Sequence, residues 1–153
     1  MSDTSKTVIV RDDGFHEEDW AGPITPADDL PANDAPALAI DLAPDADLDA
    51  LLARMNSAAL IRIGFPSFSD GRGFTLARRL RDAGYQGRLR AAGHVIADQY
   101  AMARRAGFDE VEISADLARR QPADQWQFRA NWRAHSYQSR LRGSGLSLTQ
   151  IKA

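Results

Sequence analysis

Cysteine is absent from all 153 residues of the chain. The protein therefore forms no disulfide bonds, has no thiolate nucleophile and cannot hold a zinc or iron–sulfur centre through cysteine. No flavin or nicotinamide fingerprint occurs in the sequence either. We expect a protein that binds no cofactor and that carries no thiolate-ligated redox centre of its own.

Long apolar segments are also missing. No run approaches the roughly 20 apolar residues needed to cross a bilayer, and the first residues contain no apolar core of a secretory signal. We therefore expect a soluble, cytoplasmic protein without a membrane partner. The motifs of a catalytic triad, a Walker loop and a G-x-G-x-x-G dinucleotide loop do not occur, so the motifs alone name no reaction.

The charges that are present are unevenly distributed. Residues 1–50 contain 13 acidic and two basic residues, whereas residues 51–153 contain 17 basic and eight acidic ones. Two interpretations are open. Either an acidic N-terminal segment lies across a basic domain, or each part of the chain has a partner of its own.

Residues 1–36 read as an acidic, proline-rich arm. A strand is predicted at 7–10, a hairpin turn at 12–14 and a return strand at 15–20. Four prolines between positions 23 and 36 prevent a helix of any length, which indicates a linker or a strap over the surface. We expect Trp20 to anchor this arm, because one aromatic side chain can bury a large apolar area.

From residue 37, strands and helices alternate. Strands are predicted at 37–42, 58–65, 88–92 and 110–113, with helices between them at 44–55, 71–83 and 97–106. This alternation is typical of βαβ units. We predict an α/β fold: a three-layer Rossmann-like domain at 37–142 with a mostly parallel sheet of about four to five strands. An N-terminal hairpin or arm precedes it, a C-terminal helix ends it, and a flexible tail follows at 143–153.

The carboxyl ends of the strands are the expected site of function in such a sheet. Gly71 and Gly73 flank Arg72 where a loop opens a helix, so backbone amides, the helix start and a guanidinium can together favour an oxyanion. The candidate anion-binding residues are Ser69, Asp70, Gly71, Arg72, Gly73, Gln99 and Ser114. The alternative is that Ser69 or Asp70 caps the helix and the glycines serve the turn.

His94 and Asp98 are the candidates for catalysis. A carboxylate beside an imidazole fixes its tautomer and raises its pKa, which suits a general acid or base. No nucleophile accompanies the pair, and a hydrogen-bonded surface histidine is the alternative. His16 and His135 lie in the two outer segments, so a three-histidine metal site would need both segments to fold inward. We therefore expect no metal site.

Residues 115–142 are predicted to be helical, with Pro122 in a first turn. Arginines and aromatic residues interleave along them, among them Trp126, Arg129 and Tyr137. Nucleic-acid-binding segments share this composition, but the acidic N-terminal third argues against a nucleic-acid partner. We expect one aromatic stripe to pack on the sheet and the other face to meet the N-terminal arm or a partner protein.

Residues 65–74 read Phe-Pro-x-Phe-x-Asp-Gly-Arg-Gly-Phe. This motif is followed by Ala-Arg-x-Leu-Arg at 77–81, Leu-Arg-Ala-x-Gly at 89–93, Asp-Gln at 98–99 and Gly-Phe-Asp at 107–109. Over roughly residues 37–140 the chain resembles the bacterial family labelled domain of unknown function 934. Members are commonly encoded beside assimilatory sulfite reductase and are often labelled as an oxidoreductase of sulfite reduction. The resemblance implies a role in that pathway and supplies no catalytic residues.

Two functions remain open. The first is a non-catalytic accessory protein of sulfate assimilation, which docks on sulfite reductase or its electron donor through the charged arm and the C-terminal helix. The second is a small enzyme or sensor that binds a sulfur oxyanion or a phosphorylated metabolite at the strand ends. We favour the first, because the chain has neither cysteine ligands nor a nucleotide fingerprint. The oligomeric state is left open.

Overall fold

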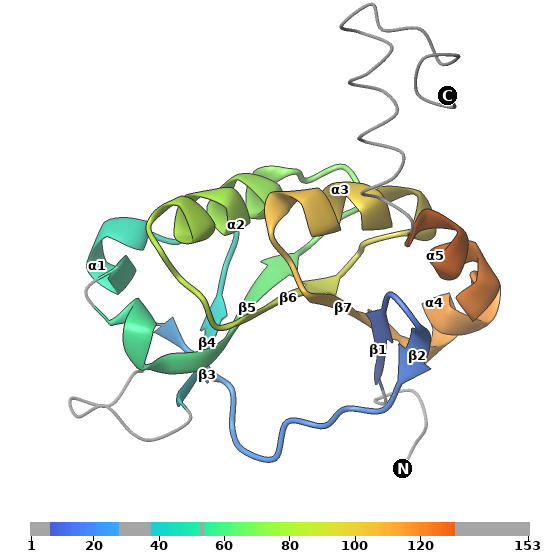
Figure 1. Ribbon diagram of the computed structural model, residues 1–153, viewed down its shortest axis with the longest axis horizontal. Coiled ribbons are helices and arrows are strands. Elements are labelled where there is room, and N and C mark those ends of the chain that lie inside the picture. Colours follow the sequence, from blue (N-terminus) through green and yellow to red (C-terminus); the bar gives the residue numbers. More distant parts are fainter. Residues whose placement is uncertain (1–6, 28–37, 53, 131–153) are drawn as a thin grey trace, which may run out of the picture.

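The computed structural model describes residues 7–27, 38–52 and 54–130. This part of the chain forms one seven-stranded sheet in the order β2-β1-β7-β6-β5-β4-β3 (Figure 1). The strands are β1 (Thr7–Arg11), β2 (Gly14–His16), β3 (Thr25–Pro26), β4 (Leu38–Leu42), β5 (Ala58–Phe65), β6 (Arg88–Gly93) and β7 (Glu110–Ser114). Strands β3 to β7 run parallel, whereas β1 pairs antiparallel with both β7 and β2.

The helices are α1 (Leu48–Leu52), the 3-10 turn η3 (Met55–Ser57), α2 (Arg72–Asp82), the 3-10 turn η4 (Ala97–Gln99), α3 (Tyr100–Ala106), α4 (Ala115–Arg120) and α5 (Ala123–Arg129). Helices α1, α2 and α3 lie between successive parallel strands, whereas α4 and α5 follow the last strand, β7. Strands β4 to β7 are neighbours in chain order, and right-handed crossovers then place the connecting helices α1, α2 and α3 on one face. Figure 1 shows α1, α2 and α3 together on that face. Because the strand order never reverses along β4 to β7, these strands form no switch-point crevice.

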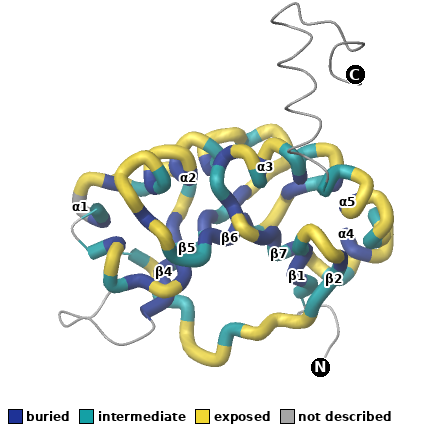
Figure 2. Tube along the Cα trace, viewed as in Figure 1, coloured by how far each residue is buried: buried dark blue, intermediate teal, exposed yellow. Residues whose placement is uncertain are grey.

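The main core lies between these helices and the sheet. Alternate strand residues point to the same face, so Ile61, Ile63 and Phe65 of β5 pack with Leu89 and Ala91 of β6. All five are nearly or completely buried. Figure 2 shows this buried band running through the centre of the sheet. The apolar periodicity of the sequence thus accounts for one face of the sheet.

The other face is covered by an extended segment, residues 17–24, which we call the strap. It connects β2 to β3 across the side opposite the helices (Figure 1). Its Glu18 and Asp19 pair with Arg90 and Arg88 of β6. The acidic N-terminal segment therefore lies against basic strand residues, as the first interpretation of the charge asymmetry predicts.

The predicted α/β class with a mostly parallel sheet is confirmed, and the four predicted core strands are all present and parallel. The layer beneath the sheet is an extended strap and contains no helix among the described residues. The return strand ends at His16, short of the predicted residue 20, because the side chains that follow reach the arginines. The helix predicted at 44–55 begins only at Leu48, after Asp47 accepts the amide of Asp49 at 3.0 Å.

The described part of the predicted helical region 115–142 contains two helices, and the second begins directly after Pro122, where the sequence predicts a first turn. Helix α4 ends before Gln121, and Pro122 is the N-cap of α5, with extended backbone at φ −62° and ψ 167°. Proline has no amide hydrogen to continue the preceding helix, so the chain forms two short helices here. The predicted continuation over 131–142 and the tail at 143–153 lie outside the described residues.

Candidate functional site

The loops that follow β5 and β6 meet at the carboxyl edge of the sheet. Nε2 of Gln99 donates a hydrogen bond to the carbonyl oxygen of Phe68 at 2.8 Å, and Oε1 accepts the amide of Ile96 at 3.0 Å. The rings of Phe68 and His94 pack edge to face, with their centroids 5.2 Å apart. The structure therefore brings Gln99 and His94 to the predicted anion loop.

Within that loop, Arg72 is bound by Asp70. Nε and Nη2 of Arg72 donate to the two carboxylate oxygens at 3.0 and 2.6 Å, and the Arg72 amide donates to Oδ1 at 3.1 Å. These bonds lower the pKa of Asp70 to about 2. The hydroxyls of Ser67 and Ser69 lie 3.2 Å apart and bond to each other. The Asp70 carboxylate thus takes the place of an oxyanion between the guanidinium and the helix start.

Close packing around Phe65 explains two of the glycines. A Cβ at Gly73 would lie 2.5 Å from the Phe65 ring, and one at Gly93 would lie 2.7 Å from the Phe65 carbonyl oxygen. Gly93 also has a φ of +114°, which L side chains rarely adopt. Gly71 precedes α2 with an ordinary φ of −92°. Gly73 and Gly93 are therefore required by helix and strand packing, with or without a ligand.

His94 and Asp98 do not form a pair among the contacts of the described residues. Nδ1 of His94 lies 3.1 Å from the carbonyl oxygen of Phe65, which also accepts the His94 amide at 3.0 Å. Since a carbonyl oxygen only accepts, we assign the ring proton to Nδ1. Asp98 accepts a hydrogen bond from Nη2 of Arg129 at 2.6 Å. The two catalytic candidates therefore have separate partners, and no acid–base dyad is assembled.

Ser114 ends β7 and caps the helix that follows. Its Oγ accepts the amide of Leu117 at 3.1 Å, which replaces one of the hydrogen bonds missing at the start of α4. With this bond, the polar side chains among the predicted site residues all have protein partners. They stabilise the loops of the edge in this arrangement.

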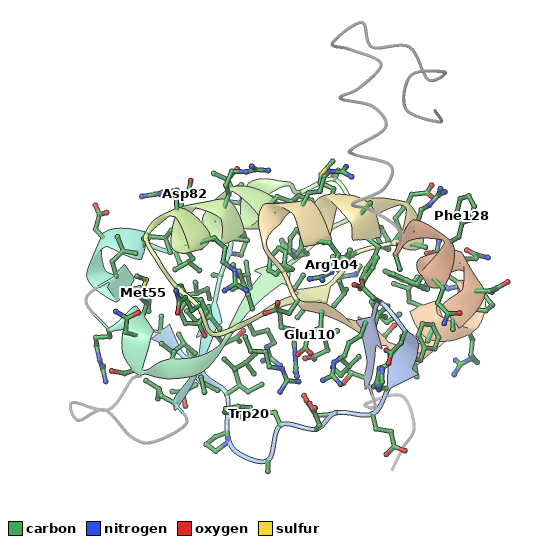
Figure 3. All side chains as sticks on the ribbon, in the orientation of Figure 1. Trp20, Met55, Asp82, Arg104, Glu110 and Phe128 are labelled. Carbon is green, nitrogen blue, oxygen red and sulfur yellow. The ribbon has the colours of Figure 1, made fainter. Side chains whose placement is uncertain are left out.

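Large apolar side chains are exposed at the same edge. Phe68 is 42% exposed and Phe128 is 66% exposed, and Figure 3 shows Phe128 pointing away from α5. A shallow pocket of about 380 Å³ lies between η4 and α5. It is lined by Ala97, Asp98, Asp124, Gln125, Phe128 and Arg129. We call Phe68, His94, Phe128 and Arg129 the edge patch.

Trp126 takes no part in this surface. Its side chain is fully buried in the core, its ring packs edge to face on Tyr100, and its Nε1 donates to the carbonyl oxygen of Gln121 at 2.8 Å. Trp126 is thus part of the core, and its ring contact is with Tyr100 of α3; the expected packing of an aromatic stripe onto the sheet stays a prediction. The aromatic and arginine residues from 132 onward lie outside the described residues.

A second polar site, absent from the predictions made above, lies on the face opposite the helices. Glu110 is 1% exposed and accepts hydrogen bonds from Nε of Arg11, Arg88 and Arg90 at 3.0, 2.9 and 2.7 Å. Figure 3 shows Glu110 on the side of the sheet that faces the strap. The signal in the sequence is a period of two, with Arg-x-Arg at 88–90 and Glu-x-Glu at 110–112.

The ion pairs on this face shift several pKa values. Burial lowers the pKa of Arg90, but the hydrogen bonds to Glu18 and Glu110 outweigh it and raise the pKa above its ordinary value. The hydrogen bond from Arg88 is the main reason that the pKa of Asp19 falls to about 2. Both shifts favour the charged forms of Arg90 and Asp19 at neutral pH.

Within residues 7–27, 38–52 and 54–130, no three histidine or acidic side chains are grouped so that they could hold a metal ion. His16 lies 2.6 Å from Asp13 in the hairpin, away from the edge. In the same part of the chain, no helix has the length and apolar character needed to span a membrane.

A family model described as "Bacterial protein of unknown function (DUF934)" matches residues 39–145. The chain matches no curated protein and no solved structure. The matched range includes every residue of the edge patch and strands β5 to β7. It begins after the strap.

Proposed function

The chain belongs to the bacterial family of unknown function DUF934, and from this membership and the geometry of the carboxyl edge we propose that it is a non-catalytic accessory protein of assimilatory sulfite reduction. It acts by docking on another protein. The observation that supports this proposal is the edge patch, in which two phenylalanines are exposed while the polar groups of the same edge already bind one another.

Catalysis or oxyanion binding needs polar groups that can turn to a ligand. At this edge Arg72 faces Asp70, Arg129 faces Asp98 and His94 faces a backbone carbonyl. Docking of a protein partner needs a different surface. Its aromatic side chains become buried when the partner binds, and the polar groups around them already have hydrogen-bond partners. Burial of Phe68 and Phe128 on docking contributes about 1 to 2 kcal/mol each, scaled from the cost of leaving a phenylalanine exposed.

The partner in this proposal is sulfite reductase or its electron donor, as the family resemblance implies. The chain has no cysteine with which to ligate an iron–sulfur cluster itself, so the redox centres belong to the partner. A cytoplasmic location goes with this assignment. The alternative function, an enzyme or sensor for a sulfur oxyanion or phosphorylated metabolite, requires Arg72 to leave Asp70.

Two variants at one position test the docking role. Phe128→Ser removes the apolar ring, whereas Phe128→Leu keeps an apolar side chain of similar reach. In a strain that lacks the gene, Phe128→Leu is expected to restore growth on sulfate and Phe128→Ser is expected to restore it poorly. Both strains should grow normally on cysteine. Circular dichroism of the purified variants checks that each one folds.

Growth of the deletion strain on sulfate at the normal rate would contradict the link to sulfite reduction. Equal growth with the two Phe128 variants would contradict docking through the edge patch. Titration calorimetry with sulfite, sulfate and phosphate tests the alternative. Saturable binding that disappears in Arg72→Ala would favour an oxyanion site over a docking surface.

A further inference from the structure

Three arginines on the face opposite the helices are oriented by one buried carboxylate. Nε of Arg11, Arg88 and Arg90 all donate to Glu110, at 2.7 to 3.0 Å. The Arg90 side chain has no exposed surface, whereas Arg11 and Arg88 are 29% and 25% exposed. Because Glu110 fixes one edge of each guanidinium, their terminal nitrogens are directed at the strap. We call Arg11, Arg88 and Arg90 the arginine cluster.

The terminal nitrogens bind two consecutive carboxylates of the strap. Nη1 and Nη2 of Arg90 donate to the two oxygens of Glu18 at 2.6 and 2.8 Å. Nη2 of Arg88 and Nη2 of Arg11 donate to opposite oxygens of Asp19. Nη2 of Arg90 lies 4.0 Å from the same carboxylate. Three guanidinium groups therefore surround one carboxylate, as in the arginine clusters that recognise acidic motifs.

The strap is held by side chains. Among the described residues, no backbone hydrogen bond joins 17–24 to the sheet, and Figure 2 shows most of this segment as exposed. Within the described part of the chain, Nε1 of Trp20 is the buried side-chain nitrogen that has no hydrogen-bond partner. Burying this donor without a partner costs free energy. The position of Trp20 therefore weakens the binding of the strap to the sheet. The carboxylates of Glu18 and Asp19 are the contacts that another acidic segment could supply.

The charge on this face also favours an acidic ligand. Four arginines and three carboxylates project from the strands: Arg11, Arg62, Arg88, Arg90, Asp41, Glu110 and Glu112. Without the strap, one guanidinium charge is in excess, and Arg11, Arg88 and Arg90 each lose a hydrogen-bonded carboxylate. Arg90 keeps its bonds to Glu110 and Glu112 when the strap leaves, but its Nη2 loses the bond to Glu18, and a ligand with negative charge can replace that bond.

We propose that the arginine cluster is a binding site for an extended acidic segment of a partner protein, and that Glu18 and Asp19 occupy it in the free chain. The site lies on a different surface from the edge patch, and it stands whether or not the partner belongs to sulfite reduction. Partner binding would displace the strap from β6 and expose the cluster to the incoming carboxylates.

A peptide is the favoured ligand over a small inorganic anion because the strap is tethered. A short tether gives its carboxylates an effective concentration of about the millimolar range. An inorganic anion replaces one carboxylate and must compete with both. An acidic segment replaces both carboxylates at once and adds backbone and side-chain contacts. It can therefore displace the tethered strap.

The test uses the full chain and a labelled peptide with the sequence of residues 15–22, Phe-His-Glu-Glu-Asp-Trp-Ala-Gly. In the double variant Glu18→Gln/Asp19→Asn, the side chains keep their shape and the strap loses the two charges that bind the arginine cluster. Fluorescence anisotropy is expected to show that the peptide binds this variant at least tenfold more tightly than the unmodified chain. Glu17→Gln is the matched control, since Glu17 is exposed and no described side chain pairs with it, and it should bind as the unmodified chain does.

Two further variants keep the result interpretable. Adding Arg88→Gln to the double variant should abolish peptide binding, as should replacing the three acids of the peptide by their amides. If the double variant does not fold, Asp19→Asn alone gives the same comparison, because Arg11 and Arg88 keep their bonds to Glu110.

Three results would overturn the proposal. The first is equal peptide binding by the double variant and Glu17→Gln. The second is displacement of the peptide by inorganic sulfate at the same concentration as by unlabelled peptide, which would indicate a small-anion site. The third is a dimer of the unmodified chain, measured by light scattering, that the double variant does not form. That dimer would make a second copy of the strap the occupant.

Discussion

Glu110→Gln is expected to destabilise the protein by about 3 kcal/mol. Removing one member of a buried ion pair costs about 3 to 5 kcal/mol, because the remaining charge is left without compensation. The lower end applies here for two reasons. Arg90 keeps its bonds to Glu18 and Glu112, and Arg11 and Arg88 are about a quarter exposed and can turn to water.

Urea unfolding monitored by circular dichroism measures this loss. For a chain of this size, about 3 kcal/mol corresponds to a fall in Tm of about 6 to 12 °C. The difference in stability between the unmodified chain and Glu110→Gln should persist in 1 M salt, because salt screens buried ion pairs much less than surface pairs. Glu17→Gln, the same chemical change at an exposed position, should alter the stability by less than about 0.5 kcal/mol. A loss below about 1 kcal/mol for Glu110→Gln would refute the reasoning that one carboxylate orients three arginines.

In urea unfolding, Gly93→Ala should destabilise the protein more than Gly84→Ala. Both glycines have a positive φ (+114° and +103°), but only a Cβ at Gly93 would meet a backbone oxygen. Equal losses of stability for the two variants would contradict this. The pKa of Asp19 falls from 3.8 to about 2 on folding, so its stabilisation is complete above about pH 4 and is lost as the pH drops to about 2. Curves of unfolding free energy against pH for the unmodified chain and Asp19→Asn should therefore converge between about pH 4 and pH 2. Curves that stay parallel would show that the Asp19 carboxylate does not stabilise the fold. In the same unfolding assay, Trp126→Ala should lower the free energy of unfolding by about 3 to 5 kcal/mol, because Trp126 is buried, and Phe128→Ala by less than about 0.5 kcal/mol, because Phe128 is exposed. Similar losses for the two variants would contradict this difference in burial.

The core strands could be predicted from the sequence because their pattern is local. Ile61, Ile63 and Phe65 alternate along β5, and burial on the helix-covered face follows from this period. The same strand carries Arg62 on the other face, paired with Asp41 and Glu112. The sequence indicated an acidic strap over the surface, but not the charged face of the sheet that the strap covers, because the paired residues come from separate strands.

The polar contacts of the candidate site were predicted less well, because proximity along the chain does not decide which side chains meet. Asp98 lies four residues from His94, yet it pairs with Arg129, 31 residues further on. Arg72 has the guanidinium needed for an anion, yet the nearest carboxylate in its own loop binds it. Such pairings depend on the positions of whole loops and helices.

By itself, the sequence determined the order of strands and helices, the apolar face of each strand and the absence of cysteine chemistry, since these depend on composition and on contacts a few residues apart. Only the tertiary structure decided which charges are paired. Glu18 lies 72 residues from Arg90, and their bidentate contact exists because β1 adds to the sheet beside β7 and returns the strap across β6. A buried arginine needs a carboxylate wherever the fold can supply one, and the fold supplies it here from the far end of the chain.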